Sequence, residues 1–350
     1  MELQILKSSI LTLMIMVFAG ASLAVTHVVS TDAEFLAATL AAVDGDLVIL
    51  VPGQYETSGN FTALVTIQGL TGDPEDVYLL VSDTATDSFV DVSGSGGEHS
   101  LQLEGLTIRS TFFGSLLDVY STSVEIRNCI FEGNGGIDNG GVLNARQCNV
   151  LVEDSTFRSN ASYYSGGAIY VEEGDLNISG CLFSDNRSGA HGGALGVEAG
   201  SLTMNDCSFR ANSSDQTGGG LFLKSATGSI IDCTFEENES TSGGGGLSIG
   251  SGSSVEVTGC EVIGNGSHTL AGGVQITGAS YAVLSYCIIL GNDLFNVGDG
   301  SLQLNSSALF HCCEMDLQYW TIAGEAEFNN EGCIVATQQE SFDSFKAMYR

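Results

Sequence analysis

The stretch CLFSDNRSGAHGGALGV, residues 181–197, decides between two interpretations of this chain. Its cysteine, acidic residue and histidine, taken alone, would suggest a reactive site built around Cys181 and His191. Similar stretches lie on both sides, STFRSNASYYSGGAIYV at 155–171 and CSFRANSSDQTGGGLFL at 207–223. The stretch is therefore one unit of a repeat, and His191 occupies a variable position within it.

The repeat has a fixed period. The asparagine that closes each F-x-x-N motif recurs every 26 residues, and two degenerate copies follow at intervals of 27, which gives the series Asn134, Asn160, Asn186, Asn212, Asn238, Asn265 and Asn292. A period of this length marks a solenoid, a propeller or an array, and a propeller blade needs about 40–45 residues. Each period contains three short alternating apolar segments, which predict three short strands. The pattern predicts a parallel β-helix whose coils stack about 4.8 Å apart.

The motif F-x-x-N followed by G-G-[AGV]-[IL] resembles the repeat of the chlamydial polymorphic outer membrane proteins. The resemblance covers residues 124 to about 276 well and residues 277–318 weakly. It implies a right-handed parallel β-helix of the pectin-lyase-like group, an all-β solenoid. Since this fold carries lyases, hydrolases, epimerases and adhesins alike, the resemblance leaves the function open.

Stacking in register turns each repeated residue into a column. The predicted inward column of large side chains is Phe131, Phe157, Phe183, Phe209, Phe235, Val262 and Ile289. The asparagines predict a buried ladder of amides at a turn. A third column, two residues before the first, is Cys129, Ser155, Cys181, Cys207, Cys233, Cys260, Cys287 and Cys313. Neighbours about 4.8 Å apart are too distant for the usual disulfide geometry, so we interpret these cysteines as small buried residues. Cys312 and Cys333 lie off the column and are a disulfide candidate.

The ends of the chain differ from the repeat. Residues 1–24 have the features of a signal peptide, with an apolar run before Ser22-Leu23-Ala24. Residues 25–60 predict an N-terminal cap with a helix over 31–43, which a Thr31–Glu34 capping box begins and which places Phe35, Leu36, Leu40 and Val43 on one face. Residues 61–330 form the predicted β-helix, and 331–350 a C-terminal cap or tail. We therefore expect an exported protein, secreted or held at a cell surface, without a membrane span once the signal peptide is removed.

The net charge of −32 disfavours nucleic acid and anionic membranes as partners. An enzyme of this fold would need a cationic base or paired carboxylates. Arg158 and Arg210, two coils apart, and His191 are the candidate catalytic residues under that alternative. The other interpretation pairs Glu132 with Arg158 and Arg210 with Glu236 as surface ion pairs between coils. We expect no metal ligands and no cofactor, and Ca²⁺ enters only with the enzyme alternative.

A binding function has aromatic candidates. After the paired glycines, the outward strand position holds Tyr170, a glycine and Phe222 in successive coils, and Tyr163 and Tyr164 lie in the adjoining loop. Two exposed rings with a gap between them would stack on sugars or on a protein partner. The sequence thus favours a non-catalytic, adhesin-like protein that binds a carbohydrate or a cell-surface protein. The alternative is a polysaccharide lyase or hydrolase.

Overall fold

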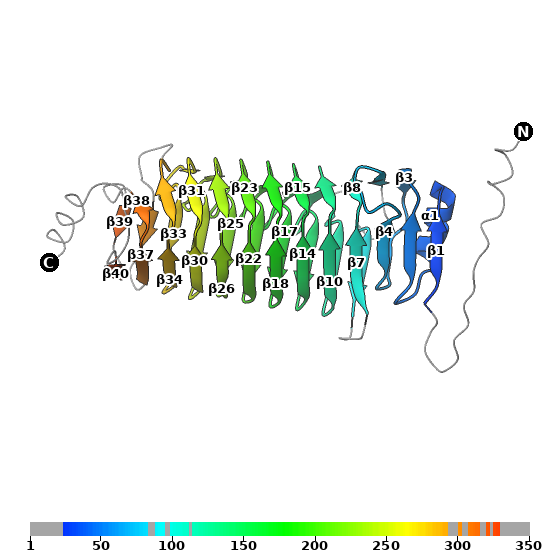
Figure 1. The fold of residues 1–350 in the computed structure, drawn as a ribbon, viewed down its shortest axis with the longest axis horizontal. Coiled ribbons are helices and arrows are strands. Elements are labelled where there is room, and N and C mark those ends of the chain that lie inside the picture. The colour runs from blue at the N-terminus through cyan, green and yellow to red at the C-terminus, as the bar shows by residue number, and fades with distance from the viewer. Residues whose placement is uncertain are drawn as a thin grey trace, which may run out of the picture.

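A computed structural model describes residues 24–82, 88–94, 99–111, 114–292, 300–302, 307–315, 320–322 and 325–329. The chain winds into a long rod in which each coil stacks on the one before it, with the N-terminal and C-terminal coils at opposite ends (Figure 1). The predicted C-terminal cap over 331–350 lies outside the described residues, as does the predicted signal peptide apart from its last residue. Among the described residues, no helix has the length and apolar character needed to cross a bilayer.

Four parallel sheets run along the rod in the described part of the chain. Sheet A contains β1 Thr26–Val29, β2 Leu47–Leu50, β4 Thr66–Gly69, β7 Ser100–Glu104, β10 Ser123–Arg127, β14 Asn149–Glu153, β18 Asp175–Ser179, β22 Ser201–Asn205, β26 Thr227–Ile231, β30 Ser254–Thr258, β34 Tyr281–Ser285, β37 Ser307–His311 and β40 Glu325–Asn329. Sheet B contains β3 Gly53–Thr57, β5 Val77–Val81, β8 Thr107–Ser110, β11 Ile130–Glu132, β15 Thr156–Arg158, β19 Leu182–Ser184, β23 Ser208–Arg210, β27 Thr234–Glu236, β31 Glu261–Ile263, β35 Ile288–Leu290 and β38 Glu314–Met315.

Sheet C contains β6 Val90–Ser93, β9 Leu117–Tyr120, β13 Leu143–Arg146, β17 Ile169–Glu172, β21 Leu195–Glu198, β25 Leu221–Lys224, β29 Leu247–Gly250, β33 Val274–Ile276, β36 Gly300–Leu302 and β39 Trp320–Ile322. Sheet D, which the sequence did not predict, consists of two-residue strands that follow the ladder asparagines: β12 Gly135–Gly136, β16 Ala161–Ser162, β20 Arg187–Ser188, β24 Ser213–Ser214, β28 Glu239–Ser240 and β32 Gly266–Ser267. The predicted parallel β-helix is confirmed.

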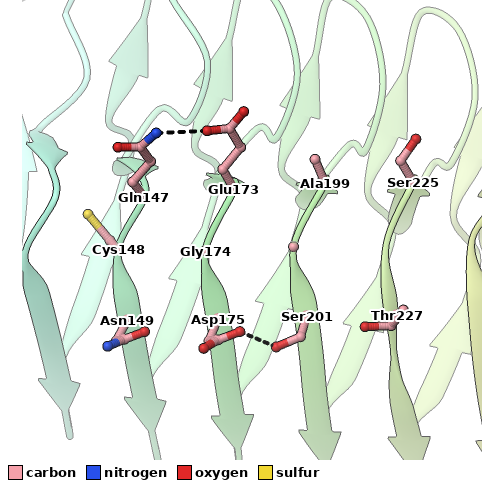
Figure 2. A pocket seen from close by; sticks show the side chains of 11 residues that line it. Gln147, Cys148, Asn149, Glu173, Gly174, Asp175, Ala199, Ser201, Ser225 and Thr227 are labelled. Carbon is pink, nitrogen blue, oxygen red and sulfur yellow. Dashed lines mark hydrogen bonds between the residues drawn. The ribbon is translucent and has the colours of Figure 1, made fainter.

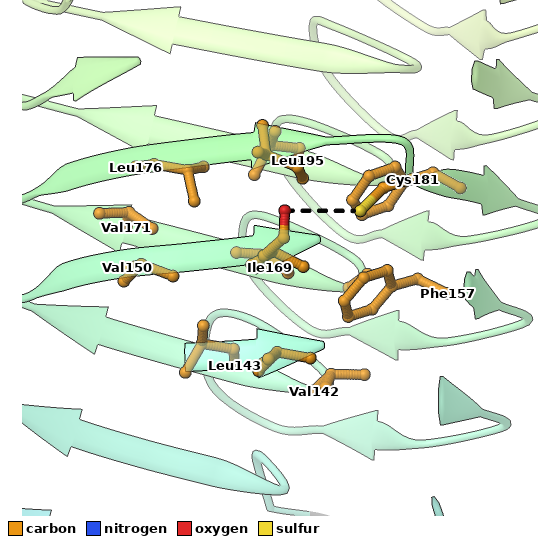
Figure 3. Close-up of a cluster of buried hydrophobic side chains, with 14 of the residues drawn as sticks. Val142, Leu143, Val150, Phe157, Ile169, Val171, Leu176, Cys181 and Leu195 are labelled. Atoms are coloured by element: carbon orange, nitrogen blue, oxygen red, sulfur yellow. Dashed lines mark hydrogen bonds between the residues drawn. The ribbon is translucent and has the colours of Figure 1, made fainter. Parts of the chain in front are cut away.

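The inward columns are in register as predicted. Phe131 pairs with Phe157, which pairs with Phe183, and the same alignment continues to Phe209 and Phe235. All five rings are fully buried and stack with centroids 4.7–5.1 Å apart. Apolar residues of sheets A and C complete the core around them (Figure 3). Burying one such side chain contributes about 1.5–3 kcal/mol, so the column accounts for a large share of the hydrophobic stabilisation.

The asparagine ladder is also confirmed. Asn186 Nδ2 donates to Asn212 Oδ1 in the next coil at 2.9 Å and to the Phe157 carbonyl in the preceding coil at 2.9 Å. The backbone N–H of Asn186 donates to the same Oδ1 at 3.0 Å. Among the ladder asparagines, only Asn134, at the N-terminal end, has a buried Oδ1 without a hydrogen-bond partner, because no asparagine precedes it in the ladder.

The cysteines of the third column are free and buried, as predicted. Their thiols donate to backbone carbonyls two residues earlier, for example Cys181 Sγ to the Ser179 carbonyl at 3.2 Å. Ser155 fills the gap in the column and accepts from the Cys129 amide at 3.1 Å. Cys312 takes part in a disulfide, and its predicted partner Cys333 lies outside the described residues.

The N-terminal cap contains one helix, α1 Asp32–Ala41, with Thr31 as its N-cap. The Glu34 amide donates to Thr31 Oγ1, and the Glu34 carboxylate accepts from the Ser30 amide, one residue earlier than a capping box requires. Phe35 is fully buried, but the predicted apolar face is otherwise wrong. Leu36, Leu40 and Val43 are 38%, 77% and 44% exposed, because the helix contacts the end of the core through Phe35, Ala38 and Thr39.

Candidate functional site

The outward side of sheet C, here called the sheet C face, differs from coil to coil. Its first outward column, in register along the rod, is Asp91, Asp118, Asn144, Tyr170, Gly196, Phe222, Ser248 and Gln275. Neighbours on either side of Tyr170 in its strand, Ile169 and Val171, belong to the hydrophobic core, whereas Tyr170 does not. The interior columns repeat one residue type, while this column carries acids, amides and rings.

Most of this column is nevertheless covered. The loop that precedes each strand folds back over it, and at Gly166 the backbone has a φ of +68° and passes so close that an added Cβ would lie 3.0 Å from Tyr170 Cβ. The prediction that Tyr170 and Phe222 expose their rings is therefore wrong, since their exposed fractions are 5% and 7%. The loops do lie next to these two rings, as predicted, but they cover the rings.

The predicted gap between the two rings is also filled. The Tyr170 ring leans over Gly196, where an added Cβ would lie 3.1 Å from Tyr170 Cδ2. His191 stacks on Phe222 with ring centroids 4.4 Å apart, and its Nδ1 lies 2.9 Å from Thr217 Oγ1. Burial lowers the pKa of His191, so its imidazole is neutral at neutral pH. A sugar has no room between the two rings.

The second outward column of the sheet C face includes Tyr120, Arg146, Glu172, Glu198 and Lys224. The Tyr170 hydroxyl donates to Glu198 Oε2 at 3.0 Å, and Lys224 Nζ donates to Glu198 Oε1 at 2.5 Å. Burial, reinforced by Glu198, raises the pKa of Tyr170 above its ordinary value, so the phenol remains a donor. These contacts leave neither the phenol nor the ammonium group prepared to act as a base.

The three residues of the catalytic alternative are not brought together. Arg158 and Arg210 lie on sheet B, whereas His191 lies in a loop over sheet C. Arg158 Nη2 lies 2.9 Å from Glu132 Oε2, which confirms that ion pair. Arg210 Nε lies 3.8 Å from Glu236 Oε2 and closer, at 3.2 Å, to Glu237 Oε2, because the following residue also reaches it.

Asp118 and Asn144 form the polar floor of the sheet C face near its N-terminal end. Asp118 Oδ1 accepts from Asn144 Nδ2 at 3.2 Å and from Arg146 Nη2 at 3.1 Å. Burial raises the pKa of Asp118, and the charges of Asp91 and Asp138 raise it further, while Arg146 opposes the shift. Asn144 is only 6% exposed, and its buried Oδ1 has no hydrogen-bond partner. The floor therefore has an acceptor that its own chain does not satisfy.

The sheet C side of the rod also carries exposed rings. Tyr163 and Tyr164 are 67% and 51% exposed, as predicted, and meet edge to face with centroids 5.1 Å apart. Their loop is fixed to the preceding coil, since the Ser165 amide donates to Asn139 Oδ1 at 2.9 Å. Tyr120, 42% exposed, follows Asp118 by two residues on the same face. With Tyr170, four of the chain's 10 tyrosines belong to two coils of this face, which the coil of β13 separates.

A separate groove of about 390 Å³ follows the turn between sheets C and A (Figure 2). Gln147 Nε2 donates to Glu173 Oε2 at 2.8 Å along one rim, and Ser201 Oγ donates to Asp175 Oδ1 at 2.5 Å along the other. Its lining residues are Gln147, Cys148, Asn149, Glu173, Gly174, Asp175, Ala199, Gly200, Ser201, Ser225 and Thr227. Their side chains include neither an aromatic ring nor a cation, so the groove offers hydrogen bonds and the negative charge of Glu173 and Asp175. Among the described residues, no group of three or more His, Cys, Asp or Glu side chains is placed to hold a metal ion.

Sequence reasoning found Tyr163 and Tyr164 but missed Asp118 and Asn144. The signal was present, because these two residues stand 52 and 26 residues before Tyr170 and so occupy the same outward column. Asn144 lies directly after the apolar pair that ends the glycine motif. A polar residue at that position in one coil carries little weight until its column partners are known.

Comparison with known proteins identifies the architecture. A family model described as a right handed beta helix region matches residues 88–231 and 193–335, which agrees with the handedness expected from the repeat. No curated protein matches the sequence.

Three solved structures illustrate the similarity. Tailspike protein 3 of bacteriophage CBA120 is 14% identical over 88% of this chain, with a TM-score of 0.44, and the match spans 59% of the tailspike's length. The A-module of a mannuronan C-5 epimerase from Azotobacter vinelandii is 14% identical over 90% of this chain and 97% of its own, with a TM-score of 0.40. The catalytic unit of a GH87 α-1,3-glucanase from Streptomyces thermodiastaticus is 14% identical over 89% of this chain and 67% of its own, with a TM-score of 0.37. At these identities and scores, the matches carry no argument about activity.

Proposed function

The chain belongs to the right-handed β-helix family, and we propose that it is an exported protein that binds a glycan on the sheet C face without cleaving it. The observation that carries the proposal is the exposed Tyr163–Tyr164 pair, which meets edge to face in the loop that precedes a strand of sheet C. A sugar presents an apolar face that stacks on a ring and hydroxyl groups that donate hydrogen bonds. The exposed rings and the partly exposed Asp118 carboxylate of the sheet C face meet these two requirements.

Different residues of the site would contribute stacking area and hydrogen bonds. Tyr163 and Tyr164 offer apolar area at low entropic cost, because a tyrosine has few rotatable bonds and their loop is tied to the coil before it. Asp118 and Arg146, on the two strands of sheet C that precede β17, are partly exposed and supply an acceptor and donors that fix orientation. Two groups that could act as a base are occupied, since Lys224 is paired with Glu198 and the Tyr170 hydroxyl donates to the same carboxylate.

The sequence repeat supports a role at the cell surface. We place the F-x-x-N and G-G-[AGV]-[IL] motifs with the repeat of the chlamydial polymorphic outer membrane proteins, which suggests an adhesin-like role at a cell surface. An apolar run before Ser22-Leu23-Ala24 supports export. The acidic surface, with a net charge of −32, agrees with a glycan partner better than with nucleic acid.

The test uses the purified protein and a panel of insoluble polysaccharides, with and without Ca²⁺. Bound protein and released sugar are measured in the same tube. We expect at least one polysaccharide to retain the protein without release of sugar. A Tyr163→Ala/Tyr164→Ala variant should bind that polysaccharide at least about tenfold more weakly than the wild type. Tyr281→Ala is the matched control, because Tyr281 is 44% exposed on sheet A, away from the site.

Two results would overturn the proposal. Release of soluble sugar would identify a polysaccharide lyase or hydrolase. Equal binding by the double variant and by Tyr281→Ala would remove the sheet C face as the binding surface.

A further inference from the structure

Asp46, at the N-terminal end of the rod, is the one buried acid among the aspartates and glutamates that the structure describes. It lies in the turn between α1 and β2, and its exposed fraction is 1%. Its Oδ1 accepts from the Val25 amide at 2.7 Å, and its Oδ2 accepts from the Val43 amide at 3.1 Å and lies 3.1 Å from His27 Nε2. A buried carboxylate is costly unless hydrogen bonds and an opposite charge offset the lost hydration.

The charges around Asp46 do not supply a permanent cation. Burial acts to raise the pKa of Asp46, but the hydrogen bonds from Val25, His27 and Val43 together outweigh it and hold the pKa below its ordinary value. The carboxylate is therefore ionised at neutral pH. His27 carries a charge only when it is protonated. Among the described residues, no lysine or arginine forms an ion pair with Asp46.

Two more titratable side chains lie near the turn. The His99 ring lies over Gly45, where an added Cβ would be 2.8 Å from His99 Cε1. Asp44 is exposed and accepts from the Leu64 amide at 2.8 Å. Neither of these contacts involves the Asp46 carboxylate.

Val25 is held at both of its backbone groups. Its N–H donates to Asp46, and its carbonyl accepts from the Leu47 amide at 3.0 Å, which aligns β1 with β2. Ala24 and the Val25 side chain are exposed, so the chain lies at the surface here while the Val25 N–H reaches a buried group. In the described part of the chain, β1 is the terminal strand of sheet A, at the end of the rod (Figure 1). Terminal strands open more readily than inner ones unless a contact ties them down.

The bond before Val25 is also the one at which the sequence predicts cleavage. Ser22 and Ala24, at the third and first positions before it, are the small residues that follow the apolar run of an export leader. Hydrolysis of this amide by one water molecule leaves a carboxylate on Ala24 and a primary amine on Val25. The amine takes up a proton at neutral pH, since the ordinary pKa of an α-amino group is about 8. The nitrogen that faces Asp46 is thus the nitrogen that cleavage would convert into an ammonium group.

We propose that an export endopeptidase cleaves the Ala24–Val25 bond and that the new α-ammonium group forms an ion pair with Asp46, which fixes the first coil of the rod. This inference rests on the export part of the proposed function and does not depend on the glycan site. The uncleaved chain offers Asp46 a neutral amide, whereas the cleaved chain offers three donors and a positive charge. Cleavage therefore adds the missing cation at a contact that already exists.

The first measurement identifies the new N-terminus. The full chain is expressed in a host that exports it, and the intact mass of the secreted protein gives its first residue. We expect Val25. Cleavage at another bond would overturn this inference but leave export in place, whereas a secreted or membrane-bound chain that retains residues 1–24 would contradict both. Binding to polysaccharides is tested separately, through Tyr163 and Tyr164.

The second measurement removes the charge and keeps the donor. Cyanate converts the Val25 amine into a ureido group that retains an N–H, and it reacts less with lysine, whose ordinary pKa of about 10.4 keeps it protonated. Peptide mapping selects molecules modified at Val25 alone. We expect hydrogen exchange in β1 and β2, including the Leu47 amide, to be at least about tenfold faster in these molecules, because a charge-assisted contact is lost. Exchange in β18, an inner strand of sheet A, should be unchanged.

Variants show whether Asp46 is the partner of the amine. Asp46→Asn should exchange rapidly in β1 and β2 and should respond no further to cyanate, since modification and substitution remove the same interaction. Asp44→Asn is the matched control, because Asp44 lies in the same turn and also accepts a backbone amide. It should keep the full response to cyanate.

Two results would overturn the inference. One is unchanged exchange in the wild-type protein after modification of Val25, a comparison that stands even if Asp46→Asn does not fold. The other is an equal response to cyanate in the Asp46→Asn and Asp44→Asn variants.

Discussion

The interior of the rod and its sheet C face differ in whether equivalent positions of successive coils carry the same residue type. Inside, one residue type recurs in coil after coil, as in the stacked ring series from Phe131 to Phe235. On the sheet C face, the same 26-residue spacing gives an aspartate, an asparagine, a tyrosine, a glycine and a phenylalanine in successive coils. Repetition serves the stacking that holds the fold, because identical groups satisfy one another across coils. A ligand, in contrast, needs different groups within a few ångströms.

The two regions also differ in how they satisfy buried polar atoms. Each inner member of the asparagine ladder has its amide fully bonded to neighbours above and below. The Asn144 amide on the sheet C face is almost as deeply buried, yet its oxygen has no partner. The first arrangement repeats an interaction that is complete. The second leaves the amide oxygen without a hydrogen-bond partner.

Alkaline pH should have the largest effect, because it acts on several thiols of the cysteine column at once. Burial raises the pKa of the Cys129 thiol to about 12, and hydrogen bonding with Cys207 raises that of Cys233 to about 12, from an ordinary value of 9.0. The unfolded chain therefore loses these protons first as the pH rises above 9, which favours unfolding. We expect the urea midpoint to fall between pH 9 and 12, and the column thiols to be unreactive towards a thiol reagent at pH 8 until urea unfolds the chain.

Cys207→Ser provides the control for this pH effect. Serine already occupies the column at position 155, so the substitution keeps the packing and removes one titrating thiol. The fall in stability at high pH should be smaller in this variant. Rapid labelling of the native column thiols at pH 8 would contradict the predicted burial.

Truncation of an interior ring should come next. Phe209 stacks on Phe183 at 4.7 Å and on Phe235 at 4.9 Å, so Phe209→Ala leaves a cavity that the coils above and below cannot fill. We expect a loss of about 3–5 kcal/mol in the free energy of unfolding, measured by urea denaturation. Phe222→Ala, on the sheet C face, should cost less, because the loop carrying His191 is free to close over the space. Equal losses would mean that the loop is as rigid as the core.

The asparagine ladder gives the third comparison. Asn212→Ala removes the acceptor of the Asn186 amide and the donor to the Phe183 carbonyl. Each buried backbone group left without a partner costs about 1–3 kcal/mol, so the variant should lose at least about 2 kcal/mol in the same denaturation experiment. Asn177→Ala, exposed on sheet A, should stay within about 0.5 kcal/mol of the wild type. Similar losses for both would show that the ladder contributes no more than a surface amide.

Removal of a surface ion pair should have the smallest effect. Arg158 and Glu132 form a contact of 2.9 Å whose side chains are 47% and 38% exposed. Arg158→Ala should change the free energy of unfolding by about 0–1 kcal/mol, and less at high salt. Glycan binding should be unchanged in a co-sedimentation assay. A loss of binding would show that the glycan binds to sheet B and not to sheet C.

The sequence predicted the interior well and the exterior poorly. The period located every member of the ladder and of the two other columns, since identical neighbours can be aligned by eye. For Tyr170 and Phe222, the outward direction was predicted, but the cover that a loop from the same coil provides was not. For α1, the apolar residues Leu36 and Leu40 suggested a buried face, yet the end of the core receives Phe35 and Ala38 instead. Direction follows from strand alternation, whereas coverage depends on which other segment is nearby.

By itself, the sequence determined that this chain is a parallel β-helix, which residues fill its core, and that its cysteines serve as small buried side chains. Those features rest on contacts between equivalent positions of adjacent coils, and a fixed period encodes them directly. Only the tertiary structure decided that Asp118 pairs with Arg146 of the next coil, and that Tyr170 is covered. The reason is physical: these contacts join different positions of different coils, and their distances depend on how far each loop folds back over its sheet.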